Sequence, residues 1–263
     1  MTFDLEACRL HFVARDSIHF PAGLAGNVLR GALGSILRTI ASAEDYARIF
    51  EPTSAGSGPS GLSDRPRPFV IRPSTLVERT IAAGEQFDFA LHLFDRRDPM
   101  LEYFTRAFGK WAELRSVDQR MVTIDLATRP TPVAHVRVEF QTPTDLKSAG
   151  DSPAGDFSVL LARARDRVST LRSMYGAGPL EIDFRGMAER ARSVRTVRCE
   201  LTRVAIQRRS SRTGQRHGIG GFIGVAEYEG DLAEFLPYLE AAHWTGVGRH
   251  CTWGNGAIAV GIL

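Results

Sequence analysis

One order of apolar patterns occurs twice in this chain, and it is the strongest constraint on the fold. Residues 3–13, 69–72, 85–95 and 122–126 read as strands, and two helices are expected from about Pro21 to Ile40 and from Pro99 to about Arg115. Alternation with period two is typical of half-buried strands, and apolar spacing of three and four is typical of helices. The first half therefore predicts the order β-α-β-β-α-β.

The second half repeats this order after the proline-flanked joint at residues 129–132, which we take as the domain boundary. Asp156 is expected to cap a long helix, and short helical patterns lie at 186–193 and from about 231. Strands are expected at 133–141, 198–206, 221–228 and 257–263. The prediction is an α+β protein with two tandem ferredoxin-like (RRM-like) domains, residues 1–129 and 130–263, and a C-terminal glycine-rich loop. The uncovered sheet faces and the space between the domains are the expected binding surfaces.

Composition excludes several classes of protein. No apolar run approaches the roughly 18 residues of a membrane span, and the N-terminus lacks the pattern of a secretory signal. The three cysteines are far apart and have neither disulfide nor zinc-site spacing. We therefore expect a reduced cytoplasmic protein with no cofactor, no metal site and no membrane partner. Residues 52–68 are rich in Pro, Gly and Ser and predict a long surface loop.

The cations are almost all arginine. The chain has 31 arginines and only two lysines, with a formal net charge of +3. Arginine binds phosphate with a planar fork of donors and stacks on bases, whereas lysine is a point charge. Codon bias in a GC-rich genome is the better explanation of the total count, so only local clustering carries functional weight.

The first candidate binding segment is the glycine-rich segment 246–256, which contains four glycines together with Arg249 and His250. A backbone without side chains lets N–H groups approach phosphate oxygens. The segment is neither a nucleotide P-loop nor a dinucleotide fingerprint, because a strand is expected where a helix is required. On spacing alone, an anion site and a tight turn that leads into the last strand are equally good interpretations.

The second candidate binding segment is a basic hairpin at residues 207–218, between two expected strands. It has four arginines, one histidine and no acidic residue: Arg208, Arg209, Arg212, Arg216 and His217. Such an arm can follow a phosphate backbone, which favours nucleic acid over a solvated hairpin tip. The strand signature of RNA-recognition domains is absent, so base stacking on the sheet is not supported.

The sequence resembles a known family. The pattern Phe-Pro-x5-Asn-x2-Arg-Gly-Ala-Leu-Gly-x3-Arg at 20–38, the run Pro-Phe-Val-Ile-Arg-Pro at 68–73 and the blocks 220–237 and 246–256 resemble the CRISPR-associated endoribonucleases that process precursor crRNA. The C-terminal block is the specific part, and the resemblance is weakest from about 141 to 195. It implies tandem ferredoxin-like domains and metal-independent cleavage within the CRISPR repeat, leaving 2′,3′-cyclic phosphate and 5′-hydroxyl ends.

The resemblance also implies the roles of individual residues. Such cleavage needs a base, an acid and cations for the developing charge, so histidine and arginine are the candidates. The stretch from Arg38 to Phe69 contains Tyr46 but no histidine, which departs from relatives that carry a histidine after the first helix. The acid/base candidates are His19 first, then His250 and His217, with Arg38 or Arg249 stabilising the transition state; an arginine-driven variant stays open. The RNA-binding candidates are Arg30, Arg208, Arg209, Arg212, Arg216, His217, Gly248, Arg249, Gly254 and Gly256.

Two other functions stay open at this point. The main alternative is a non-catalytic crRNA-binding subunit of a CRISPR effector complex, in which other subunits are additional partners. A more distant one is a ferredoxin-like scaffold with no RNA partner. All of these share the predicted fold, so only binding and cleavage separate them.

Overall fold

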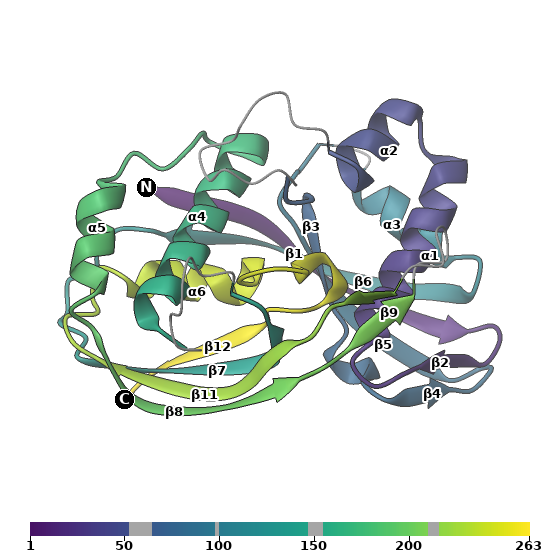
Figure 1. Cartoon of the computed structure of the whole chain (residues 1–263). Coiled ribbons are helices and arrows are strands. Elements are labelled where there is room, and N and C mark those ends of the chain that lie inside the picture. Colours follow the sequence, from purple (N-terminus) through teal and green to yellow (C-terminus); the bar gives the residue numbers. More distant parts are fainter. Residues whose placement is uncertain (53–64, 98–99, 147–154, 210–215) are drawn as a thin grey trace. The chain divides into compact units, whose positions relative to one another are not determined.

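A computed structural model describes residues 1–52, 65–97, 100–146, 155–209 and 216–263 (Figure 1). The chain forms two compact units. The N-terminal domain comprises Asp4–Val122 together with Thr252–Gly254, and the C-terminal domain comprises Met1–Phe3, Thr123–Cys251 and Asn255–Leu263. No helix among the described residues is long and apolar enough to cross a membrane.

The N-terminal domain has a four-stranded sheet in the order β3-β5-β1-β6, with antiparallel pairs β1–β5 and β3–β5. A small sheet of β2 and β4 accompanies it. Helices α1 and α3 share a core with strands β1, β3 and β5. The elements are β1 Thr2–Ala14, β2 Ile18–Phe20, α1 Ala25–Ile40, α2 Ala43–Phe50, β3 Phe69–Arg72, η1 Ser74–Leu76, β4 Arg79–Ile81, β5 Gln86–Leu93, α3 Met100–Phe108 and β6 Ala112–Asp125.

The C-terminal domain repeats the plan with sheet order β12-β7-β11-β8. Helices α4 and α6 cover one face of this sheet (Figure 1), where the Phe157 ring packs against Tyr228 and Phe235. The elements are β7 His135–Thr144, α4 Phe157–Tyr175, α5 Phe184–Ala191, β8 Arg195–Val204, β9 Gln207–Arg209, β10 Arg216–Gly218, β11 Gly221–Glu229, α6 Leu236–Thr245, η2 Cys251–Trp253 and β12 Ile258–Ile262. Both domains therefore have the ferredoxin-like strand order, which confirms the predicted α+β fold.

Local chemistry explains most element boundaries. The Asp156 side chain accepts a hydrogen bond from the Val159 N–H, so the expected cap of α4 is confirmed. The expected helix from Pro99 to Arg115 is wrong in its second half, because α3 ends at Phe108 and β6 begins at Ala112. Both Gly109 and Lys110 lie in the turn between them, and a glycine there costs helix stability. Of the loop expected at 52–68, residues 53–64 lie outside the described residues.

Candidate nucleic-acid interface and catalytic residues

Helix α1 and the short helix α2 bring Arg38 to a cluster that includes Tyr46 and Glu51. The Arg38 Nη2 donates to the Tyr46 hydroxyl at 3.1 Å, and the guanidinium lies over the Tyr46 ring at 5.3 Å. Glu51 Oε1 lies 3.4 Å from the Tyr46 hydroxyl and 3.9 Å from the guanidinium. The Arg38 side chain is 58% exposed. The hydrogen bond to Tyr46 raises the pKa of Arg38, so this exposed cation stays charged at neutral pH.

The sequence reasoning missed helix α2, which supplies Tyr46. Its signal is a capping pattern: the Ser42 hydroxyl accepts from the Asp45 N–H, and two acidic residues occupy the first turn. The helix is held by a mostly buried ion network, in which Arg48 pairs with Asp45 at 2.9 Å and with Asp95 at 2.7 Å. Asp95 is 2% exposed. This network fixes the helix that carries Tyr46.

His19 lies at the other end of α1. It belongs to β2, and its Nδ1 shares a 2.9 Å hydrogen bond with the Thr80 hydroxyl of β4. Strand β2 precedes the helix, whereas Arg38 is in the last helical turn. At 1.5 Å per residue, α1 separates the two by about 20 Å from Ala25 to Arg38. The structure therefore does not bring His19 and Arg38 to one point.

Arg30 lies on the same helix between these ends. Its guanidinium carbon is 4.4 Å from the ring centre of Phe50 and 4.7 Å from that of Trp253. Trp253 comes from the glycine-rich segment, and residues Thr252–Gly254 belong to the N-terminal domain. We call Arg30, Arg38, Tyr46, Phe50 and Trp253 the arginine–aromatic ladder.

The glycine-rich segment is tied down by its own backbone. The N–H groups of Val247, Arg249 and Gly256 donate to the carbonyls of Gly256, Asp145 and Pro143. These three donors are therefore not directed at solvent, as a phosphate cradle requires, but hold the segment against the end of β7. Five residues have a positive φ: Gly246, Gly248, His250, Gly254 and Gly256.

Side chains in and beside this segment differ in exposure. Arg249 is exposed and lies 3.5 Å from the Asp145 carboxylate, while His250 is half-buried. Asn255 is buried, and its Nδ2 donates to the Ile219 carbonyl at 2.6 Å. The sequence reasoning missed Asn255, which ties the segment to the residue that follows β10.

The basic hairpin has the expected antiparallel form over its described residues. Strands β9 and β10 pair in a register that sets Arg209 opposite Arg216 and Arg208 opposite His217. Arg216 and His217 are exposed and Arg208 is half-buried. Arg212, a further RNA-binding candidate, lies outside the described residues. The hairpin thus concentrates cations at the strands that extend β8 and β11.

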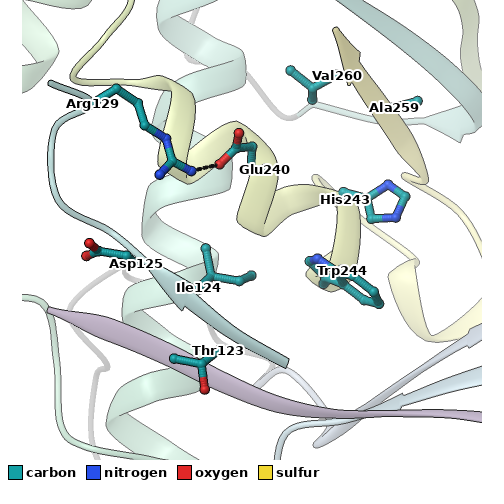
Figure 2. Close-up of a pocket in the computed structure, with 9 residues that line it drawn as sticks. All are labelled: Thr123, Ile124, Asp125, Arg129, Glu240, His243, Trp244, Ala259 and Val260. Atoms are coloured by element: carbon teal, nitrogen blue, oxygen red, sulfur yellow. Dashed lines mark hydrogen bonds and ion pairs between the residues drawn. The ribbon is translucent and has the colours of Figure 1, made fainter. Parts of the chain in front are cut away.

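A cavity of about 600 Å³ lies in the C-terminal domain (Figure 2). The Arg129 guanidinium on its wall forms an ion pair with Glu240, and His243 Nδ1 donates to the Ile258 carbonyl at 3.0 Å. The remaining lining residues are Thr123, Ile124, Asp125, Trp244, Ala259 and Val260. None of the candidates from the sequence lines it. In the part of the chain that the structure describes, no three His, Cys, Asp or Glu side chains form a potential metal site.

Comparison with known families identifies the C-terminal domain. Residues 138–258 match the family described as CRISPR-associated endoribonuclease Cas6, and residues 3–128 match a second family described as an N-terminal domain. The C-terminal domain is thus similar to the CRISPR-associated endoribonuclease family. This similarity supports an endoribonuclease activity in crRNA processing. No curated protein matches the sequence significantly.

Solved Cas6 structures share the fold over the whole chain. A Cas6 of Thermus thermophilus superposes with a TM-score of 0.61 at 16% identity, covering 99% of each chain. A second Cas6, in a product complex, gives 0.58 at 17% identity and covers 98% of this chain and 100% of its own. A chain of a partial Cas6-RT-Cas1–Cas2 complex gives a TM-score of 0.63 at 13% identity. The match covers 99% of this chain and 46% of that chain. At these identities the likeness establishes the fold.

Proposed function

We propose that this protein is an endoribonuclease that cuts CRISPR precursor RNA within the repeat. The observation that carries the proposal is the Cas6 match over residues 138–258, in a chain whose whole length has the fold of Cas6 structures. Similar structures include complexes with a product and with a substrate mimic, which supports the repeat RNA as the binding partner. The reaction is metal-independent and leaves 2′,3′-cyclic phosphate and 5′-hydroxyl ends.

In this reaction the 2′-hydroxyl upstream of the break attacks the adjacent phosphorus, and the 5′-oxygen leaves. A base takes the 2′-hydroxyl proton, an acid protonates the leaving oxygen, and cations stabilise the charge that builds on phosphorus. Arg38 is suited to the last role because its guanidinium is exposed, charged and oriented by Tyr46. A planar guanidinium binds two phosphate oxygens at once.

Three catalytic arrangements compete. His19 is the first candidate for acid or base, with its ring oriented by the Thr80 hydroxyl. The separation of His19 from Arg38 along α1, about 20 Å, means that a single scissile phosphate is served by one of them only. The arginine-driven alternative uses Arg38 with Tyr46, and the third uses His250 with Arg249 of the glycine-rich segment.

RNA binding is assigned to the basic hairpin, to Arg249 and to one arginine of α1. The cations of the basic hairpin, Arg208, Arg209, Arg212, Arg216 and His217, contact the phosphate backbone of the repeat. Arg249 binds RNA beside the tight backbone at Gly248, Gly254 and Gly256, and Arg30 is the candidate on α1. The protein then acts in the cytoplasm, where the CRISPR transcript is made.

The second candidate function is a crRNA-binding subunit without cleavage. One experiment separates the two: incubation with the cognate repeat RNA in EDTA, followed by mapping of the product ends. Cleavage at one position that leaves a 2′,3′-cyclic phosphate and a 5′-hydroxyl is the expected result. Tight binding without products supports the subunit, and a lack of salt-sensitive affinity for any hairpin RNA contradicts both.

A further inference from the structure

One face of helix α1 alternates glycine and arginine at intervals of four residues. Gly26, Arg30, Gly34 and Arg38 occupy this stripe, and positions four apart lie one above the other on a helix. The rings of the arginine–aromatic ladder lie against it: Trp253 and Phe50 contact Arg30, and Tyr46 contacts Arg38. Along this surface the arginines contact the aromatic rings, and the glycines alternate with the arginines.

The glycines let the ladder approach the helix. A Cβ atom at Gly26 would overlap the backbone carbonyl of Trp253, and a Cβ at Gly34 would overlap the ring of Phe50. By contrast, a Cβ at Gly31, on the same helix, would meet nothing within 4 Å. The close approach of Trp253 and Phe50 is thus specific to the stripe and does not reflect a general need for glycine in α1.

Arg30 holds these two rings from one position. Its guanidinium lies over the Phe50 ring, which comes from the end of α2, and over the Trp253 ring, which comes from the glycine-rich segment. A planar guanidinium is attracted by the faces of aromatic rings and stacks on them, whereas an ammonium group does not stack. One side chain therefore connects α1 to two segments far apart in the sequence.

The contact continues to Arg38. The ring of Phe50 packs against Tyr46 with centres 5.6 Å apart, and the Tyr46 hydroxyl accepts the hydrogen bond from Arg38. We propose that Arg30 is a positioning residue that seats Trp253 and α2 on α1 and thereby places Tyr46 against Arg38. This inference rests on the proposed function, and it gives Arg30 a task other than the RNA contact expected from sequence.

The two roles of Arg30 predict different kinetics. If Arg30 positions the ladder, Arg30→Met lowers the single-turnover cleavage rate about tenfold or more, while the dissociation constant for repeat RNA and its salt dependence stay unchanged. Arg30→Lys keeps the cation without the stacking plane and recovers only part of the rate. If Arg30 instead binds a phosphate, Arg30→Met weakens binding and lowers the salt slope by about one, and Arg30→Lys restores affinity.

A pair of glycine variants provides the matched control. Gly34→Ala displaces Phe50 and should reproduce the rate loss of Arg30→Met, whereas Gly31→Ala should leave rate and binding unchanged. Should Gly34→Ala fail to fold, Phe50→Leu serves in its place, because it removes the ring that Arg30 and Tyr46 both contact. If the cleavage rate of Gly34→Ala, or of Phe50→Leu in its place, equals that of Gly31→Ala, the proposal is overturned.

Hydrogen exchange tests the same claim without cleavage. Arg30→Met should speed amide exchange in Thr252–Gly254 and in α2 about tenfold or more relative to wild type, and Gly31→Ala should not. Unchanged exchange in these segments contradicts the positioning role whether or not the wild type cuts RNA. A wild type that cuts nothing, with exchange altered as expected, overturns the proposed function and leaves the positioning role standing.

Discussion

Two surfaces of the molecule, helix α1 of the N-terminal domain and the exposed face of the C-terminal sheet, hold their arginines in different ways. Along α1, the guanidinium groups of Arg30 and Arg38 lie over aromatic rings, and the Glu51 carboxylate lies 3.9 Å from Arg38. On the C-terminal sheet, the face away from α4 and α6 carries arginines that are paired with carboxylates. These pairs are Arg137–Glu227, Arg195–Glu229, Arg198–Glu200 and Arg198–Glu227. The same fold therefore presents a cationic helix face in one domain and a neutralised sheet face in the other.

This difference shows that the partner of an arginine, more than the number of arginines, decides what the residue offers to a phosphate. A close carboxylate competes with phosphate for the guanidinium, whereas an aromatic ring contacts only the face of its plane. We therefore expect RNA chemistry on α1 and at the hairpin rather than on the C-terminal sheet. Each prediction below tests one side of this contrast.

The largest effect is expected at Arg38. Arg38→Ala removes an exposed cation proposed to stabilise the transition state, and the loss of one such donor lowers rates by about 10² to 10³. Arg198→Ala removes a carboxylate-paired arginine and should leave cleavage nearly unchanged. Single-turnover cleavage of the repeat RNA measures both. Equal losses for the two variants contradict the contrast between the domains.

A buried arginine–carboxylate pair should contribute more to the free energy of unfolding than an exposed pair. Burial raises the pKa of Asp95, but hydrogen bonds from Arg97 and Arg48 outweigh it and hold the pKa below the usual 3.8. Asp95→Asn leaves Arg48 partly uncompensated and should lower the free energy of unfolding by about 3 kcal/mol at pH 7. Glu200 is exposed, so Glu200→Gln should change the free energy of unfolding little. Denaturant unfolding of the two variants compares them.

The sign of the pH dependence follows from the lowered pKa of Asp95. Its contribution to stability is complete above pH 3.8 and is lost as the pH falls through the lower folded value. The stability difference between wild type and Asp95→Asn should therefore shrink below pH 3.8. A difference that stays constant down to pH 2 argues against a carboxylate held by the two arginines.

His19 tests which end of α1 performs proton transfer. If His19 is the acid or base at the scissile phosphate, His19→Ala lowers cleavage at least about a hundredfold with binding intact, and Arg38→Ala then has the smaller effect. The comparison variant is His250→Ala. Near-normal cutting by His19→Ala assigns proton transfer to His250 or to the Arg38–Tyr46 pair instead.

The smallest effect is expected at the hairpin. Charge reversal of Arg208 and Arg209 should weaken repeat binding about tenfold and lower the salt slope by about two, because each phosphate contact releases about one counterion. The chemical step of bound RNA should change less. Charge reversal of Arg195 and Arg198, which are already paired with glutamates, is the control. An unchanged dissociation constant for the hairpin variant removes it from the RNA interface.

Much of the fold could be predicted from sequence because its strands are half-buried. Strands β1, β3 and β5 alternate or run apolar, and β3 lies at the expected residues 69–72. The prediction was wrong at the end of α3, where Trp111 and Leu114 continue a helical spacing although they belong to the turn and to β6. Most of β6 is exposed on both faces, so the strand has no alternation to reveal it.

The candidate site was less predictable because its contacts are non-local. The sequence drew attention to His19, Arg30 and Arg38, but not to the length of helix that separates the first from the last. It also left an anion site and a tight turn equally open in the glycine-rich segment, where Asp145 and Pro143 accept hydrogen bonds from two of the N–H groups. Spacing along a chain shows which residues share a helix face, but it does not show which ring or carbonyl reaches them.

The central claim is that this chain cuts RNA through a 2′-hydroxyl. The most direct measurement is cleavage of a repeat RNA with a single 2′-deoxy nucleotide immediately upstream of the cut, in EDTA, beside the unmodified RNA and a 2′-deoxy control elsewhere in the repeat. We predict that the first substrate binds normally and stays intact while the other two are cut. Cleavage of the first substrate at the normal position and rate contradicts the claim.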